Sequence, residues 1–140
     1  MTKDTSKLVE ELGLCDEFRT FYDENKDYMI SQELHDMLLQ LVWEKGLQKA
    51  PLFRKAEISE IYGYQIFSGA RLPDRKKLLC LAVAMELNVE EVQTLLRCAG
   101  YAPLYVRRPA DSVVLYGICQ KMSLPEINAM LFEYGQETLG

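Results

Sequence analysis

The sequence has few of the residues on which catalysis and metal binding depend. It contains one histidine in 140 residues, and its four cysteines lie far apart, without the Cys-x-x-Cys spacing of zinc and redox sites. No nucleophile or carboxylate cluster can be assembled around His35, and no glycine-rich loop suggests a nucleotide site. We therefore expect no enzyme activity, no cofactor and no metal.

Long apolar runs are also missing. No stretch approaches the roughly 18 apolar residues that a membrane-spanning helix requires. The charged start, MTKDTSKLVEELG, lacks the apolar core of a secretory signal. Separated cysteines are typical of a reduced protein. These absences predict a soluble, cytoplasmic protein without a membrane partner.

The residues that are present predict an all-α chain. Hydrophobic residues make up 49% of the sequence and charged residues 26%, which is the balance of a globular protein. Helical periodicity dominates, no strand-like alternation competes with it, and we find no internal repeat. We expect an acidic helical arm over residues 1–30, a helical domain over residues 31–100 and a two-helix hairpin over residues 101–140.

Capping residues locate the starts of the predicted helices, because Ser, Asp and Asn accept hydrogen bonds from the free amides of a first turn. The helix starts that we expect are at Ser31, Ser59, Asp74, Asn88 and Ser123. The last of these opens a capping box that Glu126 completes. We expect Trp43, near the end of the first domain helix, to pack within the protein rather than to bind a ligand.

Charge is distributed unevenly along the chain. The net charge is −5, but residues 45–77 hold eight Lys or Arg and three Asp or Glu, a net of +5. The preceding residues, 1–44, have a net charge of −7, and residues 78–140 have −3. A basic segment between acidic flanks indicates a local electrostatic footprint for an anionic partner. The alternative is a basic face that is only solvated.

The basic segment resembles a known DNA-binding domain. Residues 46–74, GLQKAPLFRKAEISEIYGYQIFSGARLPD, resemble the helix-turn-helix of the lambda-repressor-like (Cro/C1, XRE-family) domain. The matching positions are Gly46, Leu47, Leu52, Lys55, Ala56, Ile58, Ser59, Ile66, Gly69, Arg71 and Pro73. With LLCLAVAMELNVEEVQTLL, the likeness covers residues 31–99. It implies a five-helix lambda-repressor-like domain in a bacterial-type transcriptional regulator that binds double-stranded DNA.

The resemblance also assigns roles to residues. In this family the second of two crossing helices enters the major groove, so the helix after Ser59 would be the recognition helix. Ile58 and Ile66 would face the core, and Gln65 would bond an adenine edge. Lys49, Arg71 and the run Arg75-Lys76-Lys77 would contact phosphates of the DNA backbone. The complete set of expected DNA-contacting residues is Lys49, Ser59, Glu60, Ile61, Tyr64, Gln65, Arg71, Arg75 and Lys76.

Several positions depart from the family pattern. Glu57 replaces the usual glycine of the turn, where a left-handed backbone costs a non-glycine residue roughly 1 kcal/mol. Phe53 stands where alanine is usual and Gly63 where isoleucine is usual, so we expect the Phe53 ring to fill the space over Gly63. Glu60 would repel phosphates unless it accepts a hydrogen bond from a cytosine amine.

Other functions stay open at this point. The fold could serve as a protein–protein interaction adaptor that does not bind DNA, because the predicted recognition helix carries Glu60, Tyr62 and Tyr64 but no Lys or Arg. Alternatively, the acidic N-terminal segment could fold over the basic patch and mask it. The apolar stripe of the C-terminal hairpin would be either a homodimer or partner surface, or buried within its own domain.

Overall fold

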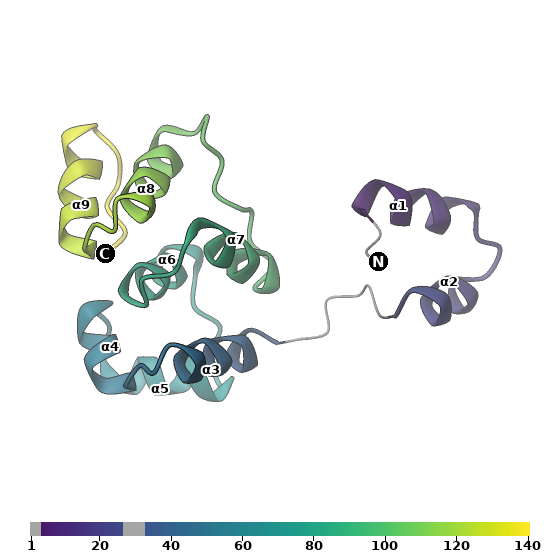
Figure 1. Ribbon diagram of the computed structural model, residues 1–140, viewed down its shortest axis with the longest axis horizontal. Helices are drawn as coiled ribbons and strands as arrows, with labels where there is room; N and C mark the ends of the chain where they lie inside the picture. The colour runs from purple at the N-terminus through teal and green to yellow at the C-terminus, as the bar shows by residue number, and fades with distance from the viewer. Residues whose placement is uncertain (1–3, 27–32) are drawn as a thin grey trace. The chain divides into compact units, whose positions relative to one another are not determined.

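The computed structural model describes residues 4–26 and 33–140, and these residues form only helices and connecting loops (Figure 1). The chain divides into two compact units, Met1–Ser31 and Gln32–Gly140. We call them the N-terminal unit and the main unit. The prediction of an all-α fold is confirmed for the described residues. The predicted cap Ser31 lies outside them.

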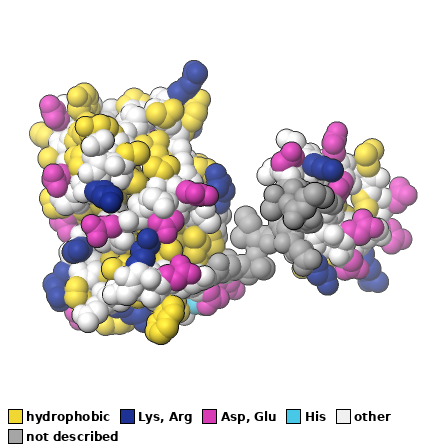
Figure 2. Space-filling model, viewed as in Figure 1, with side chains coloured by type: hydrophobic (Ala, Val, Ile, Leu, Met, Phe, Trp, Pro, Cys, Tyr) yellow, Lys and Arg dark blue, Asp and Glu magenta, His cyan; other side chains and the backbone are white. Residues whose placement is uncertain are grey.

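Within residues 4–26, the N-terminal unit contains two short helices, α1 (Thr5–Leu14) and α2 (Phe18–Asn25). Asp4 caps α1 by accepting a hydrogen bond from the Lys7 amide. No side chain of α1 is buried. Figure 2 shows acidic side chains spread over this unit.

The main unit contains seven helices within its described residues: α3 (Leu34–Glu44), α4 (Lys49–Lys55), α5 (Glu60–Ser68), α6 (Arg75–Ala84), α7 (Val89–Cys98), α8 (Pro109–Cys119) and α9 (Leu124–Glu133). Helix α6 is the central one, because residues 78–84 are all buried and the helix packs against α4, α7 and α9 (Figure 1). The hydrophobic core therefore runs continuously from α3 to α9.

The predicted capping residues begin the helices as expected. The side chains of Ser59, Asp74, Asn88 and Ser123 each accept a hydrogen bond from an amide in the first turn. The capping box that Ser123 opens is present, with Glu126 as its second member. Helix α3 starts at Leu34 with Glu33 as its N-cap, whose side chain makes no capping bond.

Two successive helical hairpins share backbone features at a fixed offset of 35 residues, although the sequence shows no repeat. The N-caps Asn88 and Ser123 are 35 positions apart and both open capping boxes. Just before them, Glu86 and Lys121 share a left-handed backbone with φ of 56°. At the same offset, the glycines after α7 and α9, Gly100 and Gly135, have φ of 82° and 73°. Hairpin α8–α9 therefore repeats hairpin α6–α7 without a gap.

Side-chain bonds to the following loop are repeated as well. The Gln93 amide group of α7 donates to the Leu104 carbonyl (2.8 Å) and accepts from the Leu104 amide (2.7 Å). Asn128 of α9, 35 positions after Gln93, accepts from the Leu139 amide at 2.8 Å. The two hairpins pack reciprocally, α6 on α9 and α7 on α8, so the C-terminal hairpin continues the core of the domain.

The left-handed turn of α4–α5 gives a first prediction. Glu57 has φ of 58°, as expected from its place in the sequence. Replacing Glu57 by Gly should raise the free energy of unfolding by about 1 kcal/mol, because glycine adopts this backbone without the steric penalty. Urea unfolding monitored by circular dichroism measures the change.

The control for this prediction is Glu90→Gly, in the first turn of α7, where the backbone is helical. Glycine there should lower the free energy of unfolding by up to about 1 kcal/mol, because it lacks helix propensity. Equal effects of the two substitutions would contradict the argument from backbone strain.

Candidate functional site

The α4–α5 hairpin has the geometry that its sequence predicts. Its turn is closed by two backbone hydrogen bonds, from the Glu57 amide to the Arg54 carbonyl and from the Ile58 amide to the Phe53 carbonyl, both 3.1 Å. The Ser59 hydroxyl then accepts from the Tyr62 amide and starts α5. The two helices are therefore joined by a short, fully bonded turn.

Phe53 and Gly63 hold the two helices together. The Phe53 side chain is fully buried, and a Cβ atom placed on Gly63 would lie 2.6 Å from its ring. The ring meets Tyr64 edge-on at 5.1 Å between centroids and Phe67 at 5.4 Å. The predicted exchange of sizes at these two positions is confirmed, and it fixes how closely α5 approaches α4.

One side of α5 is buried and the other is exposed. Gly63, Ile66 and Phe67 are buried, which confirms the prediction that Ile66 faces the core. Ile58, just before the helix, is half-buried and packs on the core. The side chains on the outer side are Glu60, Ile61, Tyr64 and Gln65, of which Gln65 is half-buried. Ile61 is 76% exposed, so an apolar side chain projects from the first turn.

Two cations lie on aromatic rings of α5. The Lys49 ammonium, at the start of α4, is 5.8 Å from the centroid of the Phe67 ring. The Arg71 guanidinium, in the loop after α5, is 5.7 Å from the centroid of the Tyr62 ring. Cation–π contact at this distance orients a charged side chain without neutralising it. Both rings belong to α5, so the charges flank that helix.

Two of the other predicted phosphate contacts are bonded within the chain. The Arg75 guanidinium donates to both carboxylate oxygens of Asp111, at 3.3 and 3.2 Å, and to the carbonyl oxygens of Ala102 and Pro103. We do not assign Arg75 to the DNA interface, because its guanidinium is bonded to groups within the folded chain. The Lys76 ammonium pairs with Glu137 at 2.7 Å. That pair is exposed, and such pairs contribute little to stability.

The basic segment therefore forms no uniform basic face. Lys45, its first residue, also pairs with an acidic side chain, that of Glu91, at 3.3 Å. On the side of the main unit that Figure 2 shows, Lys and Arg side chains are interspersed with Asp and Glu. Among the described residues, three basic side chains of the segment have neither an acidic partner nor an aromatic ring: Arg54, Lys55 and Lys77.

Two apolar side chains of α3, Leu39 and Trp43, form an exposed row. Trp43 is 85% exposed, so the prediction that it packs within the protein is wrong. Leu39, one turn earlier on α3, is 37% exposed. Both line a shallow groove of about 450 Å³ that also includes Lys49. The signal was present in the sequence, since Leu39 and Trp43 are four residues apart and off the buried stripe of α3.

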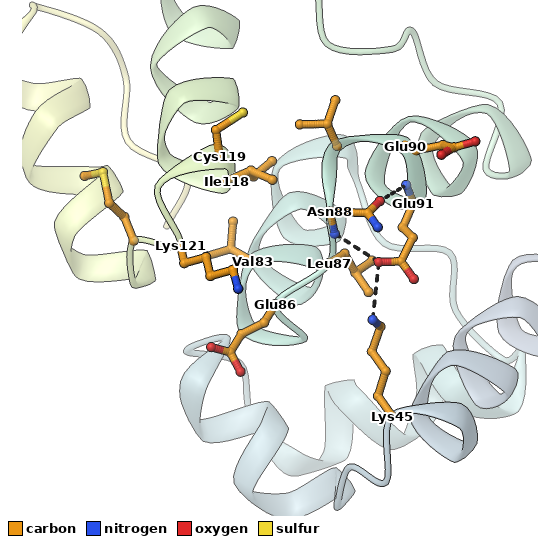
Figure 3. A pocket seen from close by; sticks show the side chains of 12 residues that line it. Lys45, Val83, Glu86, Leu87, Asn88, Glu90, Glu91, Ile118, Cys119 and Lys121 are labelled. Carbon is orange, nitrogen blue, oxygen red and sulfur yellow. Dashed lines mark hydrogen bonds and ion pairs between the residues drawn. The ribbon is translucent and has the colours of Figure 1, made fainter.

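A larger cleft lies between the α6–α7 turn and the α8–α9 turn (Figure 3). It has a volume of about 630 Å³, and three of the polar residues that line it, Lys45, Asn88 and Glu91, are bonded to one another. Glu91 accepts from the Asn88 amide at 2.9 Å and donates its own amide to the Asn88 side chain. The Glu91 carboxylate also forms an ion pair with the Lys45 ammonium. These groups complete the cap of α7, so the fold accounts for them.

Comparisons with protein-family models, curated proteins and solved structures find no match to this chain. Within residues 4–26 and 33–140, no three His, Cys, Asp or Glu side chains are grouped so that they could hold a metal ion. None of the helices in those ranges has both the length and the apolar run needed to cross a membrane.

Packing of Phe53 on Gly63 gives the second prediction. Gly63→Ala should lower the free energy of unfolding by roughly 1–3 kcal/mol, because the added methyl overlaps a buried ring that cannot move aside. This cost exceeds the gain of about 1 kcal/mol that alanine brings to a helix. Thermal or urea unfolding measures the loss.

The rescue variant combines Gly63→Ala with Phe53→Leu, which shortens the buried ring. The double variant should be more stable than Gly63→Ala alone. If Phe53→Leu instead adds its full separate cost to that of Gly63→Ala, the two residues do not share one space and the packing argument is wrong.

Proposed function

We propose that the main unit contains a lambda-repressor-like helix-turn-helix domain and that the chain is a sequence-specific DNA-binding transcriptional regulator. The observation that carries the proposal is an exposed helix face on α5 together with two cations, Lys49 and Arg71, that lie on rings of the same helix. Such a helix can enter a major groove while the cations contact the phosphates on either side. The proposal places the protein in the bacterial cytoplasm with its DNA.

The outer side chains of α5 suit base contacts of two kinds. Gln65 offers the amide pair that bonds an adenine edge. Ile61, 76% exposed, offers an apolar surface for the methyl group of thymine. Glu60, in the first turn, can accept from the amine of cytosine. The helix would then read bases with neutral and acidic groups and leave the phosphates to the flanking cations.

A regulator of this class usually binds as a dimer to two half-sites about one helical turn apart. Within the proposal, the second copy contacts the C-terminal hairpin, where Phe132 is 79% exposed and Tyr134 61% exposed at the end of α9. The inner side of this hairpin is already covered, because α8 and α9 pack on α7 and α6.

DNA binding gives the third prediction. Arg71→Ala should weaken binding to every duplex sequence alike and make the slope of log K against log salt shallower by about 0.9, the contribution of one phosphate contact. Lys49→Ala should act in the same way. Fluorescence anisotropy with random duplex DNA at several salt concentrations measures both effects, and Lys121→Ala, in the α8–α9 turn, is the control.

Recognition of the DNA base sequence is tested separately with Gln65→Ala. Selection from a random duplex library identifies the preferred site for the wild type and for the variant. The variant should lose discrimination at one base pair by roughly 1–3 kcal/mol. An unchanged preference would remove Gln65 from the base-reading residues.

A second candidate function is a protein–protein adaptor built on the same fold. Two observations favour it. Apolar side chains of α3 and α5, Trp43 and Ile61 above all, are exposed, and α5 has no Lys or Arg. Exposed aromatic and aliphatic side chains are typical anchors of protein interfaces. The same salt titration separates the two functions: an adaptor shows no affinity for duplex DNA even at low salt, whereas a regulator binds and loses affinity as salt rises.

A further inference from the structure

The loop that carries Arg71 is bonded to the connector between α7 and α8. The Tyr101 hydroxyl donates a hydrogen bond to the carbonyl oxygen of Pro73 at 2.5 Å. Pro73 is buried and belongs to the loop of residues 69–74, which follows α5 directly. Tyr101 is 28 positions further along the chain, so one side chain links the end of the α5 loop to the C-terminal part of the fold.

The same loop sets the position of Arg71. Its amide donates to the Gln65 carbonyl at 3.1 Å, and its guanidinium lies over the Tyr62 ring. Burial raises the pKa of the Tyr62 hydroxyl, the Asp74 carboxylate raises it further, and the Arg71 charge lowers it. Tyr101 adds a smaller increase. Tyr62 therefore has groups from both the loop and the connector around it.

The connector is itself held firmly. Arg75 donates to the carbonyl oxygens of Ala102 (3.0 Å) and Pro103 (3.3 Å), directly after Tyr101. The carboxylate of Asp111, a residue that is 6% exposed, accepts hydrogen bonds from the Arg75 guanidinium and, at 3.0 Å, from the Tyr105 amide. A buried carboxylate with two such donors is costly to release. Arg75 of α6 and Asp111 of α8 thus hold the connector that carries Tyr101.

We propose that Tyr101 is a positioning residue for DNA binding, which acts by holding the loop of residues 69–74 so that Arg71 stands beside α5. The inference rests on the proposed function, in which Arg71 contacts a phosphate of the DNA. It also assigns the C-terminal hairpin a role in that function, because the connector on which Tyr101 lies is held by Asp111 of α8. Positioning by a distant segment lowers the cost of ordering a cation on binding.

The test is Tyr101→Phe, which removes one oxygen and keeps the ring. Its affinity for duplex DNA should fall roughly two- to tenfold, the range expected for one hydrogen bond. The slope of log K against log salt should become shallower, by up to about 0.9 if the Arg71 contact is lost. The matched control is Tyr105→Phe in the same connector, whose side chain is 52% exposed, and it should leave both quantities unchanged.

A double-mutant cycle separates positioning from general destabilisation. If Tyr101 acts through Arg71, Tyr101→Phe has no further effect on DNA affinity in a protein that already carries Arg71→Ala. A full additional loss in that background would overturn the inference, because the hydroxyl would then act by another route.

An experiment without DNA keeps the inference separate from the proposed function. NMR-detected hydrogen exchange should show faster exchange of the Arg71 amide in Tyr101→Phe than in the wild type, with exchange in α9 unchanged. If that result comes from a protein that binds no DNA, the proposed function fails and the coupling of loop to connector stands. An unchanged Arg71 amide overturns the inference whatever the DNA measurements show.

Discussion

The contact between the Phe53 ring and the bare backbone of Gly63 is the constraint on which the candidate site depends. It lets α5 lie directly against α4, and because the ring is fully buried, neither helix can shift without opening a cavity or a clash. The buried positions of α5 follow from this contact, and so does the outward direction of Ile61. A left-handed residue, Glu57, and a serine cap then set the angle at which the chain enters α5.

Charges of the main unit are divided between the fold and the surface. The Arg75 guanidinium is bonded to the Asp111 carboxylate and to two carbonyl groups. Breaking the partly buried pair of Arg75 and Asp111 would leave the carboxylate without its counter-ion. The exposed pair of Lys76 and Glu137 is different in kind, because solvent screens it. Hydrogen bonding to Lys76 lowers the pKa of the Glu137 carboxyl, as expected for a group that accepts from a cation. What stays beside α5 is the pair of cations supported by aromatic rings, so a ligand there meets few charges, each already oriented.

Local features were predictable from the sequence, and distant partnerships were not. The caps at Ser59 and Asn88, the left-handed Glu57 and the packing of Phe53 on Gly63 depend on neighbouring residues, and all are confirmed. Arg75 looked like a phosphate contact because Asp111 is 36 positions away. The repeat was hidden because equivalent positions exchange residue types, such as Leu81 for Tyr116 and Asn88 for Ser123, and because the left-handed residues Glu86 and Lys121 are not glycines.

The repeat also explains why the C-terminal hairpin matters to a site that it does not contain. Hairpins α6–α7 and α8–α9 each use an amide side chain, Gln93 or Asn128, to hold a leucine in the segment that follows. In the first copy that segment is the connector with Tyr101, which returns to the loop after α5. Because the Tyr101 hydroxyl is bonded to the Pro73 carbonyl, the connector is joined to the loop that carries Arg71 by a bond outside α5.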